Sequence, residues 1–168
     1  MSRQKIFFWS ESDKEQYGCF SNFYEGPYEI DGKLWPTTEH YFAAMKTQDV
    51  EQQEAIREAA TPLDAKRMGR VVTLRPDWED VKYDVMIDAL TAKFGNNMKL
   101  KEILLSTGDA LIYEDSPYDK IWGTGEKGGV GTGQNLLGKA LMQVRQEFLW
   151  YNKFGREHGY AQGAYISF

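Results

Sequence analysis

The most informative segment of the sequence is Trp35-Pro36-Thr37-Thr38-Glu39-His40-Tyr41-Phe42-Ala43-Ala44-Met45-Lys46. A proline followed by two threonines is typical of a helix start, with Thr37 or Thr38 as the N-cap. Glu39 then lies in the first turn, where the helix dipole favours a carboxylate. Residues 39, 42, 43 and 46 share one helix face, so we expect the head groups of Glu39 and Lys46 to reach one small molecule. A capping carboxylate and a solvated lysine are the alternative interpretation of the same spacing.

Helix and turn signals on either side of this segment predict the fold class. Before it, Tyr28–Ile30 and Lys33–Trp35 flank Asp31-Gly32, a two-residue hairpin signal. Caps, glycine stops and 3.6-residue periodicity predict helices over residues 62–68, 78–95, 99–105 and 137–148, and strands over residues 5–10 and 110–113. The pattern lacks the strand–helix alternation of a doubly wound sheet. We therefore expect a helix-rich α+β fold: a single domain over residues 1–150 with a small antiparallel β element, then an aromatic, glycine-rich tail over residues 151–168.

The composition of the chain excludes several classes of function. The chain has 168 residues, 42% hydrophobic and 27% charged, which fits one soluble globular domain. Its one cysteine, Cys19, excludes an internal disulfide and a cysteine-based zinc site, and two histidines leave little for a metal centre, so we expect no metal and no cofactor. A net charge of −5 excludes a basic coat for non-specific nucleic-acid binding. No apolar run approaches the roughly 20 residues of a membrane span, so we expect no membrane partner and a reducing, cytoplasmic location.

Two further segments carry groups suited to ligand binding. Phe20-Ser21-Asn22-Phe23 places two polar side chains beside aromatic rings, which suits a pocket mouth where a ring stacks on the ligand. The alternative is a loop with two core aromatic residues. Ala65-Lys66-Arg67-Met68-Gly69-Arg70 places arginines near a glycine turn, a pattern that suits phosphate recognition, although a solvated helix face has the same appearance.

The third segment is Asp119-Lys120-Ile121-Trp122-Gly123-Thr124-Gly125, with more glycines following before Asn135. Glycines allow close backbone approach, and a loop that leads into a helix N-terminus is a typical anion site. The segment is neither a Walker loop nor a dinucleotide-binding fingerprint, because it lacks the Gly-Lys-Ser/Thr ending and the preceding βαβ strand. A flexible surface loop is the alternative interpretation.

Taken in this order, the motifs resemble those of the NADAR family, also called YbiA-like. The resemblance covers roughly residues 6–150, and its most specific part is Glu39-His40-Tyr41-Phe42. This sequence departs from the family pattern at Cys19 and at Ala43-Ala44-Met45. The resemblance implies a helix-rich α+β fold and an N-glycosidase that acts on ribose attached through an exocyclic amine, with Lys46 as the nucleophile and Asp119 as a second carboxylate.

The linkage itself supports this chemistry. A ribose C1 that carries an exocyclic nitrogen opens readily to an imine, and an enzyme amine can then exchange with the base amine to form a Schiff base. This role requires Lys46 to be partly neutral. Glu39 would shuttle protons or steady the developing positive charge. Without a lysine nucleophile, the carboxylates alone would run direct attack by water.

Binding roles follow by position. We expect Ser21, Asn22 and the loop over residues 123–135 to hold ribose and pyrophosphate, with Phe20, Trp35 or Trp122 against a ring and Arg67 and Arg70 facing phosphate. The full set of predicted binding residues is Phe20, Ser21, Asn22, Trp35, Arg67, Arg70, Trp122, Gly123, Gly125 and Asn135.

Three functions remain open on the sequence. The first is removal of ADP-ribose from guanine bases of nucleic acid, so that the partner is an ADP-ribose-containing ligand or an ADP-ribosylated nucleic acid. The second is cleavage of phosphorylated ribosylamino-pyrimidines, the early intermediates of riboflavin synthesis. The third is a non-catalytic ADP-ribose-binding module, which the presence of Glu39, Lys46 and Asp119 together argues against, because binding alone needs no amine beside the glycosidic carbon.

Overall fold

The computed structural model describes residues 2–9 and 15–155. Its elements, in chain order, are β1 (Lys5–Phe8), η1 (Gly18–Phe20), β2 (Tyr28–Ile30), β3 (Lys33–Trp35), α1 (Thr38–Ala44), α2 (Val50–Arg57), α3 (Pro62–Met68), α4 (Trp78–Gly95), α5 (Met98–Ser106), β4 (Leu111–Glu114), α6 (Leu136–Trp150) and η2 (Tyr151–Gly155). The fold is therefore helix-rich α+β, as the sequence predicts.

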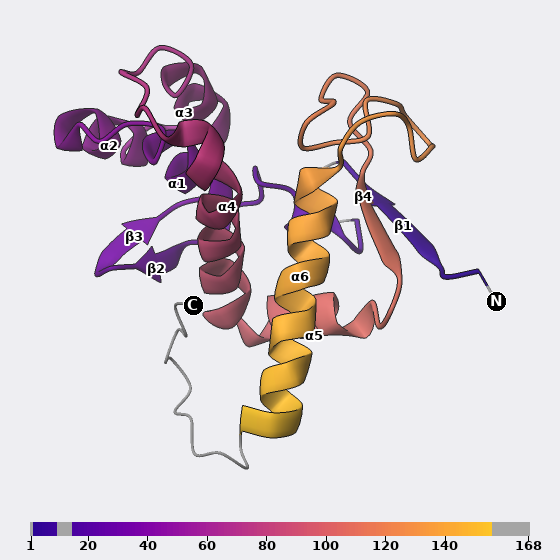
Figure 1. Cartoon of the computed structure of the whole chain (residues 1–168). Coiled ribbons are helices and arrows are strands. Elements are labelled where there is room, and N and C mark those ends of the chain that lie inside the picture. The colour runs from indigo at the N-terminus through magenta and orange to yellow at the C-terminus, as the bar shows by residue number, and fades with distance from the viewer. Residues whose placement is uncertain (1, 10–14, 156–168) are drawn as a thin grey trace.

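The elements form two groups on either side of α4, the longest helix. Figure 1 shows α1, α2, α3 and the β2–β3 hairpin on one side, and β1, β4 and the long loop that precedes α6 on the other. Helix α4 packs against α6 and also against α1, so it joins the two groups. The loop between β4 and α6 lies at the same end of the molecule as α3.

The hairpin forms as predicted, with Tyr28 opposite Trp35 and Asp31 at a φ of 51° in the turn. The second sheet is a parallel pair, β1 with β4, in which Ile6 pairs with Ile112. The sequence pattern predicted both strands but not their pairing, because parallel partners far apart in the chain leave no local signal. Strand β1 ends at Phe8, so it is shorter than expected.

Helix α1 begins where the sequence places it. Thr37 is the N-cap, and its side chain accepts a hydrogen bond from the His40 amide. The helix ends at Ala44, however, so Lys46 lies in the turn that follows rather than in a continuous helix. The Lys46 carbonyl accepts a hydrogen bond of 2.8 Å from the Arg75 amide, which fixes this turn against the segment before α4.

Helix α3 packs closely on α1 through small residues. Thr61 caps α3 and Gly69 ends it, both as predicted. A Cβ atom at Gly69 would lie 2.8 Å from the Ala43 Cβ, and Ala43 is fully buried. Larger side chains at these two positions would separate the helices. The small side chains of Ala43 and Gly69 therefore let α3 lie close against α1.

Other boundaries differ little from expectation. Helices α4 and α5 cover the predicted segments, and α2 is an additional helix. Helix α6 ends at Trp150 and continues as one π-helical turn over Tyr151–Gly155, and residues 156–168 of the predicted tail lie outside the described residues. The division into residues 1–150 and 151–168 stays a prediction. Within the described part of the chain, no helix is both long and apolar enough to cross a membrane.

Candidate active site

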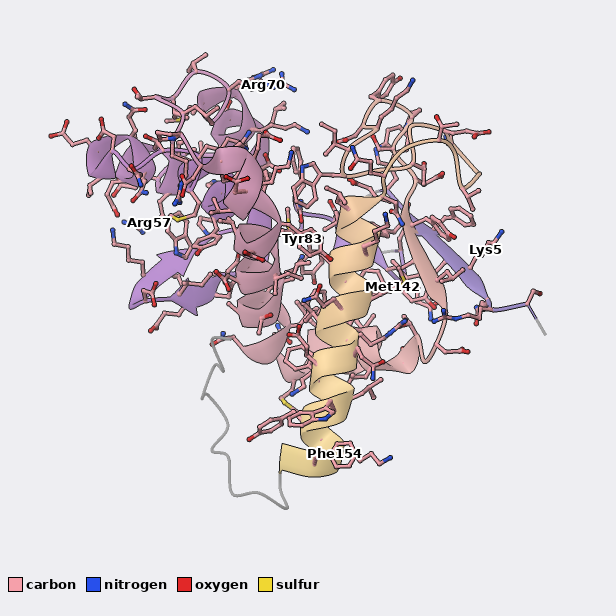
Figure 2. The ribbon with its side chains drawn as sticks, viewed as in Figure 1. Lys5, Arg57, Arg70, Tyr83, Met142 and Phe154 are labelled. Atoms are coloured by element: carbon pink, nitrogen blue, oxygen red, sulfur yellow. The ribbon has the colours of Figure 1, made fainter. Side chains whose placement is uncertain are left out.

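Six charged side chains from separate parts of the chain act on one another at the α3 end of the molecule. They are Glu39 on α1, Lys46 after α1, Lys66 on α3, Arg70 after α3, Glu114 on β4 and Asp119 in the loop that follows. Figure 2 shows Arg70 at the same end of the molecule as this loop. The structure thus brings together the three predicted catalytic residues, and it adds Glu114 and Lys66.

Glu39 is held deep in the first turn of α1. Its side chain is 7% exposed, and its amide donates a hydrogen bond of 2.9 Å to the Asn22 carbonyl. Burial raises the pKa of Glu39 above its usual value, while Lys66, Lys46 and Arg70 oppose the rise and Asp119 adds to it. The carboxyl therefore lies in a low-dielectric setting with three cations nearby.

Lys46 faces the same region from the other end of α1. Its Nζ lies 5.6 Å from the centroid of the Phe42 ring, and the side chain is partly buried. Burial lowers the pKa of Lys46, Lys66 and Arg70 lower it further, and Glu39 opposes the shift. No ion pair within 4 Å joins Lys46 to Glu39 in the described residues. A lysine in this setting has an increased neutral fraction, which nucleophilic attack requires.

Phe42 forms an aromatic wall beside Lys46. Its ring contacts Trp78 and Trp122 edge-on, with both centroid separations at 5.0 Å. Trp78 lies in the core at the start of α4, whereas Trp122 is only partly buried. Trp122 therefore remains the candidate for the expected contact between an aromatic ring and the ligand.

Asp119 shapes the turn that carries Trp122. Its Oδ1 accepts hydrogen bonds of 2.8 Å from the amides of Ile121 and Trp122. This aspartate turn fixes the carboxyl in place. Asp119 also raises the pKa of both Glu39 and Glu114, so its charge faces the same region as theirs.

The Phe20–Phe23 segment divides into core and site residues. Phe20 has no exposed surface and packs on Phe8 and Phe94, so the expected contact of its ring with a ligand is wrong for this structure. Phe23 is partly buried instead, and the Lys66 Nζ lies 5.5 Å from its ring centroid. Phe23 is therefore the ring of this segment that faces the charged cluster.

Ser21 and Asn22 connect this segment to Glu39. The Ser21 Oγ accepts a hydrogen bond from the Phe23 amide, and the Ser21 carbonyl accepts one of 2.9 Å from the buried Lys93 Nζ. The Asn22 Oδ1 is buried and has no hydrogen-bond partner in the described residues. An unpaired buried amide oxygen is available to a ligand.

Two other predicted binding residues lie away from the charged cluster. Trp35 is 3% exposed and packs edge-on against Tyr41, so its ring has no open face on which a base can stack. Arg67 is exposed and pairs with Asp64 at 3.6 Å, and it does not act on Glu39 or Lys46. The helical turn directs Lys66 and Arg70 to the site and Arg67 away from it.

The glycine loop folds back onto the start of α6. The Leu136 and Leu137 amides, the first two of the helix, donate to the Ile121 and Trp122 carbonyls at 3.1 Å. The helix N-terminus is therefore not the open anion site that the sequence suggested, because loop carbonyls already satisfy these amides.

Asn135, Gly123 and Gly125 hold the loop together. The Asn135 side chain donates to the Ile112 carbonyl and accepts from the Glu114 amide, so it ties the loop to β4 rather than facing outward. A Cβ atom at Gly123 would lie 3.1 Å from the Glu114 carbonyl oxygen, and Gly125 has a φ of 67°. Contacts of these residues with ribose or pyrophosphate stay a prediction.

Sequence reasoning missed Glu114 and Lys66 as site residues, and it missed the burial of Lys93. Alternation along β4 was the available signal for Glu114, because it shares a strand face with the buried Ile112. The four-residue spacing between Lys66 and Arg70 was the signal for Lys66. Lys93 had none, since a lysine on a helix is usually solvated. No group of three or more histidine, cysteine or acidic side chains suited to a metal ion occurs in residues 2–9 and 15–155.

The profile of the NADAR domain family matches residues 7–149. The chain belongs to the NADAR family. It is 46% identical over 144 residues to the N-glycosidase YbiA of Escherichia coli (strain K12), a match that covers 84% of this chain and 87% of that protein. The NMR structure of E. coli YbiA is similar to it with a TM-score of 0.81 and 43% identity, over 92% of this chain and 90% of that one.

Another relative of this chain carries a different name. The riboflavin biosynthesis protein VVA0006 of Vibrio vulnificus is 40% identical over 146 residues, which are 86% of this chain and 38% of that protein. The motif resemblance to the NADAR family and the α+β fold are thus confirmed. The relatives' names support N-glycosidase activity in the NADAR family.

Proposed function

We propose that this NADAR protein is an N-glycosidase that cleaves the bond between ribose C1 and an exocyclic amine, and that its substrate is ADP-ribose attached to guanine in nucleic acid. The observation that carries the proposal is the pairing of Lys46, whose pKa is lowered, with Glu39, whose pKa is raised, at one aromatic-walled site. Two ionisable groups pushed away from their ordinary pKa values in one place are typical of acid–base and nucleophilic catalysis.

The reaction would proceed through a Schiff base. Ring opening of the glycosylamine forms a C1=N bond to the base and leaves the ring oxygen as a hydroxyl. The neutral Lys46 amine adds to C1, and the base amine then leaves with the electron pair of the C1–N bond. Water attacks the resulting lysine imine, releases the sugar and restores the amine. Glu39 in its ionised form would stabilise the positive charge that develops at C1.

Charge supports a phosphate-bearing ligand. Lys66 and Arg70 act on Glu39 and Lys46 and have no ion-pair partner within 4 Å in the described residues. Unpaired cations beside a catalytic lysine suit pyrophosphate. They lie near the reacting groups rather than spread over the surface, which fits a single flipped or unpaired nucleotide better than a long duplex.

A ribosylamino-pyrimidine phosphate is the second candidate substrate. It carries the same exocyclic linkage and one phosphate, and two relatives are named riboflavin biosynthesis proteins, VVA0006 of Vibrio vulnificus and PYRR of Zea mays. The chemistry at Lys46 would be unchanged, and the two substrates would differ in the base attached to C1 and in the phosphate groups on the ribose. A cytoplasmic location would suit either substrate.

One assay separates these functions. The protein is incubated with an ADP-ribosylated guanine oligonucleotide and, separately, with a ribosylamino-pyrimidine phosphate, and release of the free base is followed by mass spectrometry. Faster turnover of the oligonucleotide at equal concentration is expected. Faster turnover of the pyrimidine would favour the second substrate, and tight ADP-ribose binding without any turnover would leave a binding module.

A further inference from the structure

A third carboxyl group, Glu114, points into the site from β4. Ile112 and Glu114 share one face of the strand because side chains alternate, and Ile112 is fully buried. Tyr113 lies on the opposite face and stacks on Phe7 of β1 at 5.2 Å. The last inward position of β4 thus carries an acid where the core meets the charged cluster.

The backbone of Glu114 is fixed from both sides of the loop. Its amide donates a hydrogen bond of 3.0 Å to the Asn135 Oδ1. Its carbonyl accepts a hydrogen bond of 2.9 Å from the Thr124 amide, and Thr124 is fully buried. Residues from the middle and the end of the loop therefore hold the backbone that carries the acid, and a reacting group needs such a fixed position.

One oxygen of this carboxyl, Oε2, is buried and has no hydrogen-bond partner in the described residues. The ionisable groups that act on Glu114 are Asp119 of the loop, Lys66 of α3 and Glu39 of α1. A buried carboxylate without a partner is unfavourable, whereas a protonated carboxyl is much less so and retains a proton to donate.

We propose that Glu114 is the general acid that protonates the departing base nitrogen. The inference rests on the proposed function. As the bond between C1 and the base nitrogen breaks, its electron pair stays on nitrogen, and the Glu114 proton completes the amine. The water that hydrolyses the lysine imine adds its oxygen to C1 and returns one proton to the Glu114 carboxylate. The net reaction consumes one water and leaves both Lys46 and Glu114 as they began.

Glu114 suits this role better than Glu39 does. Burial raises the pKa of Glu114 to about 7, Asp119 and Glu39 add to the rise, and Lys66 is the cation that opposes it. Three cations oppose the rise at Glu39. Burial raises the pKa of both carboxyls, but Glu114 has one opposing cation and a buried carboxyl oxygen without a partner, and both features favour a proton on Glu114.

The test compares Glu114→Gln with Glu102→Gln, an exposed control on α5. Glutamine has nearly the same shape but no acidic proton. We expect kcat to fall about 10²-fold with KM changed less than about threefold, and the fall in wild-type kcat above about pH 7 to disappear. Glu102→Gln should match wild type. Wild-type kcat with the same alkaline limb in Glu114→Gln would overturn the proposal.

Two further measurements separate a chemical role from a structural one. ADP-ribosyl arylamines with less basic leaving amines need less protonation, so the rate difference between wild type and Glu114→Gln should shrink along such a series. A constant difference would contradict the acid role. One component of the infrared carbonyl band of protonated carboxyls, lost near pH 7 in wild type and missing from Glu114→Gln, is expected even if no substrate is turned over. Its absence from wild type would overturn the inference whether or not the proposed function holds.

Discussion

Glu39 and Lys46 lie near opposite ends of α1, and each shifts the pKa of the other without forming an ion pair within 4 Å. A direct ion pair would hold the lysine protonated and remove its lone pair from chemistry. Burial lowers the pKa of the Lys46 amine, and the Phe42 ring lies 5.6 Å from it.

Removal of the Lys46 amine should abolish turnover. Lys46→Ala and Lys46→Arg should both lower kcat by on the order of 10³-fold or more, because a guanidinium keeps the charge but forms no imine. Lys99→Ala, an exposed change on α5, is the control. Borohydride added during turnover should leave a ribose-derived mass on Lys46. Turnover that persists in Lys46→Ala would favour direct attack by water.

Glu39 should lower the stability of the folded protein at high pH while it supports catalysis. Burial raises its pKa in the folded state, so the folded protein binds this proton more tightly than the unfolded chain does. Stability from this group is present below its unfolded pKa and is lost as the pH rises through its folded pKa. Glu39→Gln should therefore raise the melting temperature at pH 8, by roughly 2–4 °C for each 1 kcal/mol gained, and should do so less at pH 4.

The same variant should lower kcat by about 10²-fold and change ligand affinity much less. Thermal melts at the two pH values and initial-rate kinetics provide the measurements. A melting temperature that falls equally at both pH values would show that Glu39 supports the fold rather than the chemistry.

The basic residues of α3 should differ in their effect on binding. Lys66→Gln and Arg70→Gln should each weaken ADP-ribose binding about 10-fold, because each removes a charge that acts on the site. Arg67 lies between them in sequence but pairs with Asp64 at the surface. Arg67→Gln should therefore change the affinity for ADP-ribose less than about twofold. Calorimetric titration with ADP-ribose measures all three. Equal losses in the three variants would indicate a diffuse charge effect instead.

Lys93 should make stability depend on pH. It is 1% exposed and donates a hydrogen bond to the Ser21 carbonyl, and burial lowers its pKa from 10.5 to about 7. Between these two values the unfolded chain binds one proton more than the folded protein does. The free energy of unfolding should therefore rise with pH through this window, by up to about 1.4 kcal/mol per pH unit.

Lys93→Met removes this group, so the stability of wild type relative to the variant should increase from pH 7 to pH 10. Urea unfolding at several pH values measures the difference. Parallel stability curves would contradict the lowered pKa of Lys93.

Local chemistry explains which parts of the protein the sequence determined. The Asp31-Gly32 turn and the Thr37 and Thr61 caps act over two or three residues, so their signals are complete in the sequence. The position of Glu39 in the first turn of α1 also follows from the local cap, whereas Lys46 lies beyond the helix in a turn that a hydrogen bond from the Arg75 amide fixes. The hairpin turn, the caps and the position of Glu39 needed no knowledge of the rest of the chain.

Tertiary packing decided the rest. Phe20 and Trp35 resemble ligand-stacking residues in sequence, but the core covers their rings. Glu114 becomes a site residue only because β4 pairs with β1 and the loop folds back on it, and Lys66 faces Glu39 only because Gly69 lets α3 approach α1. Burial and long-range proximity set the pKa values of these groups, and both arise only when distant segments pack together.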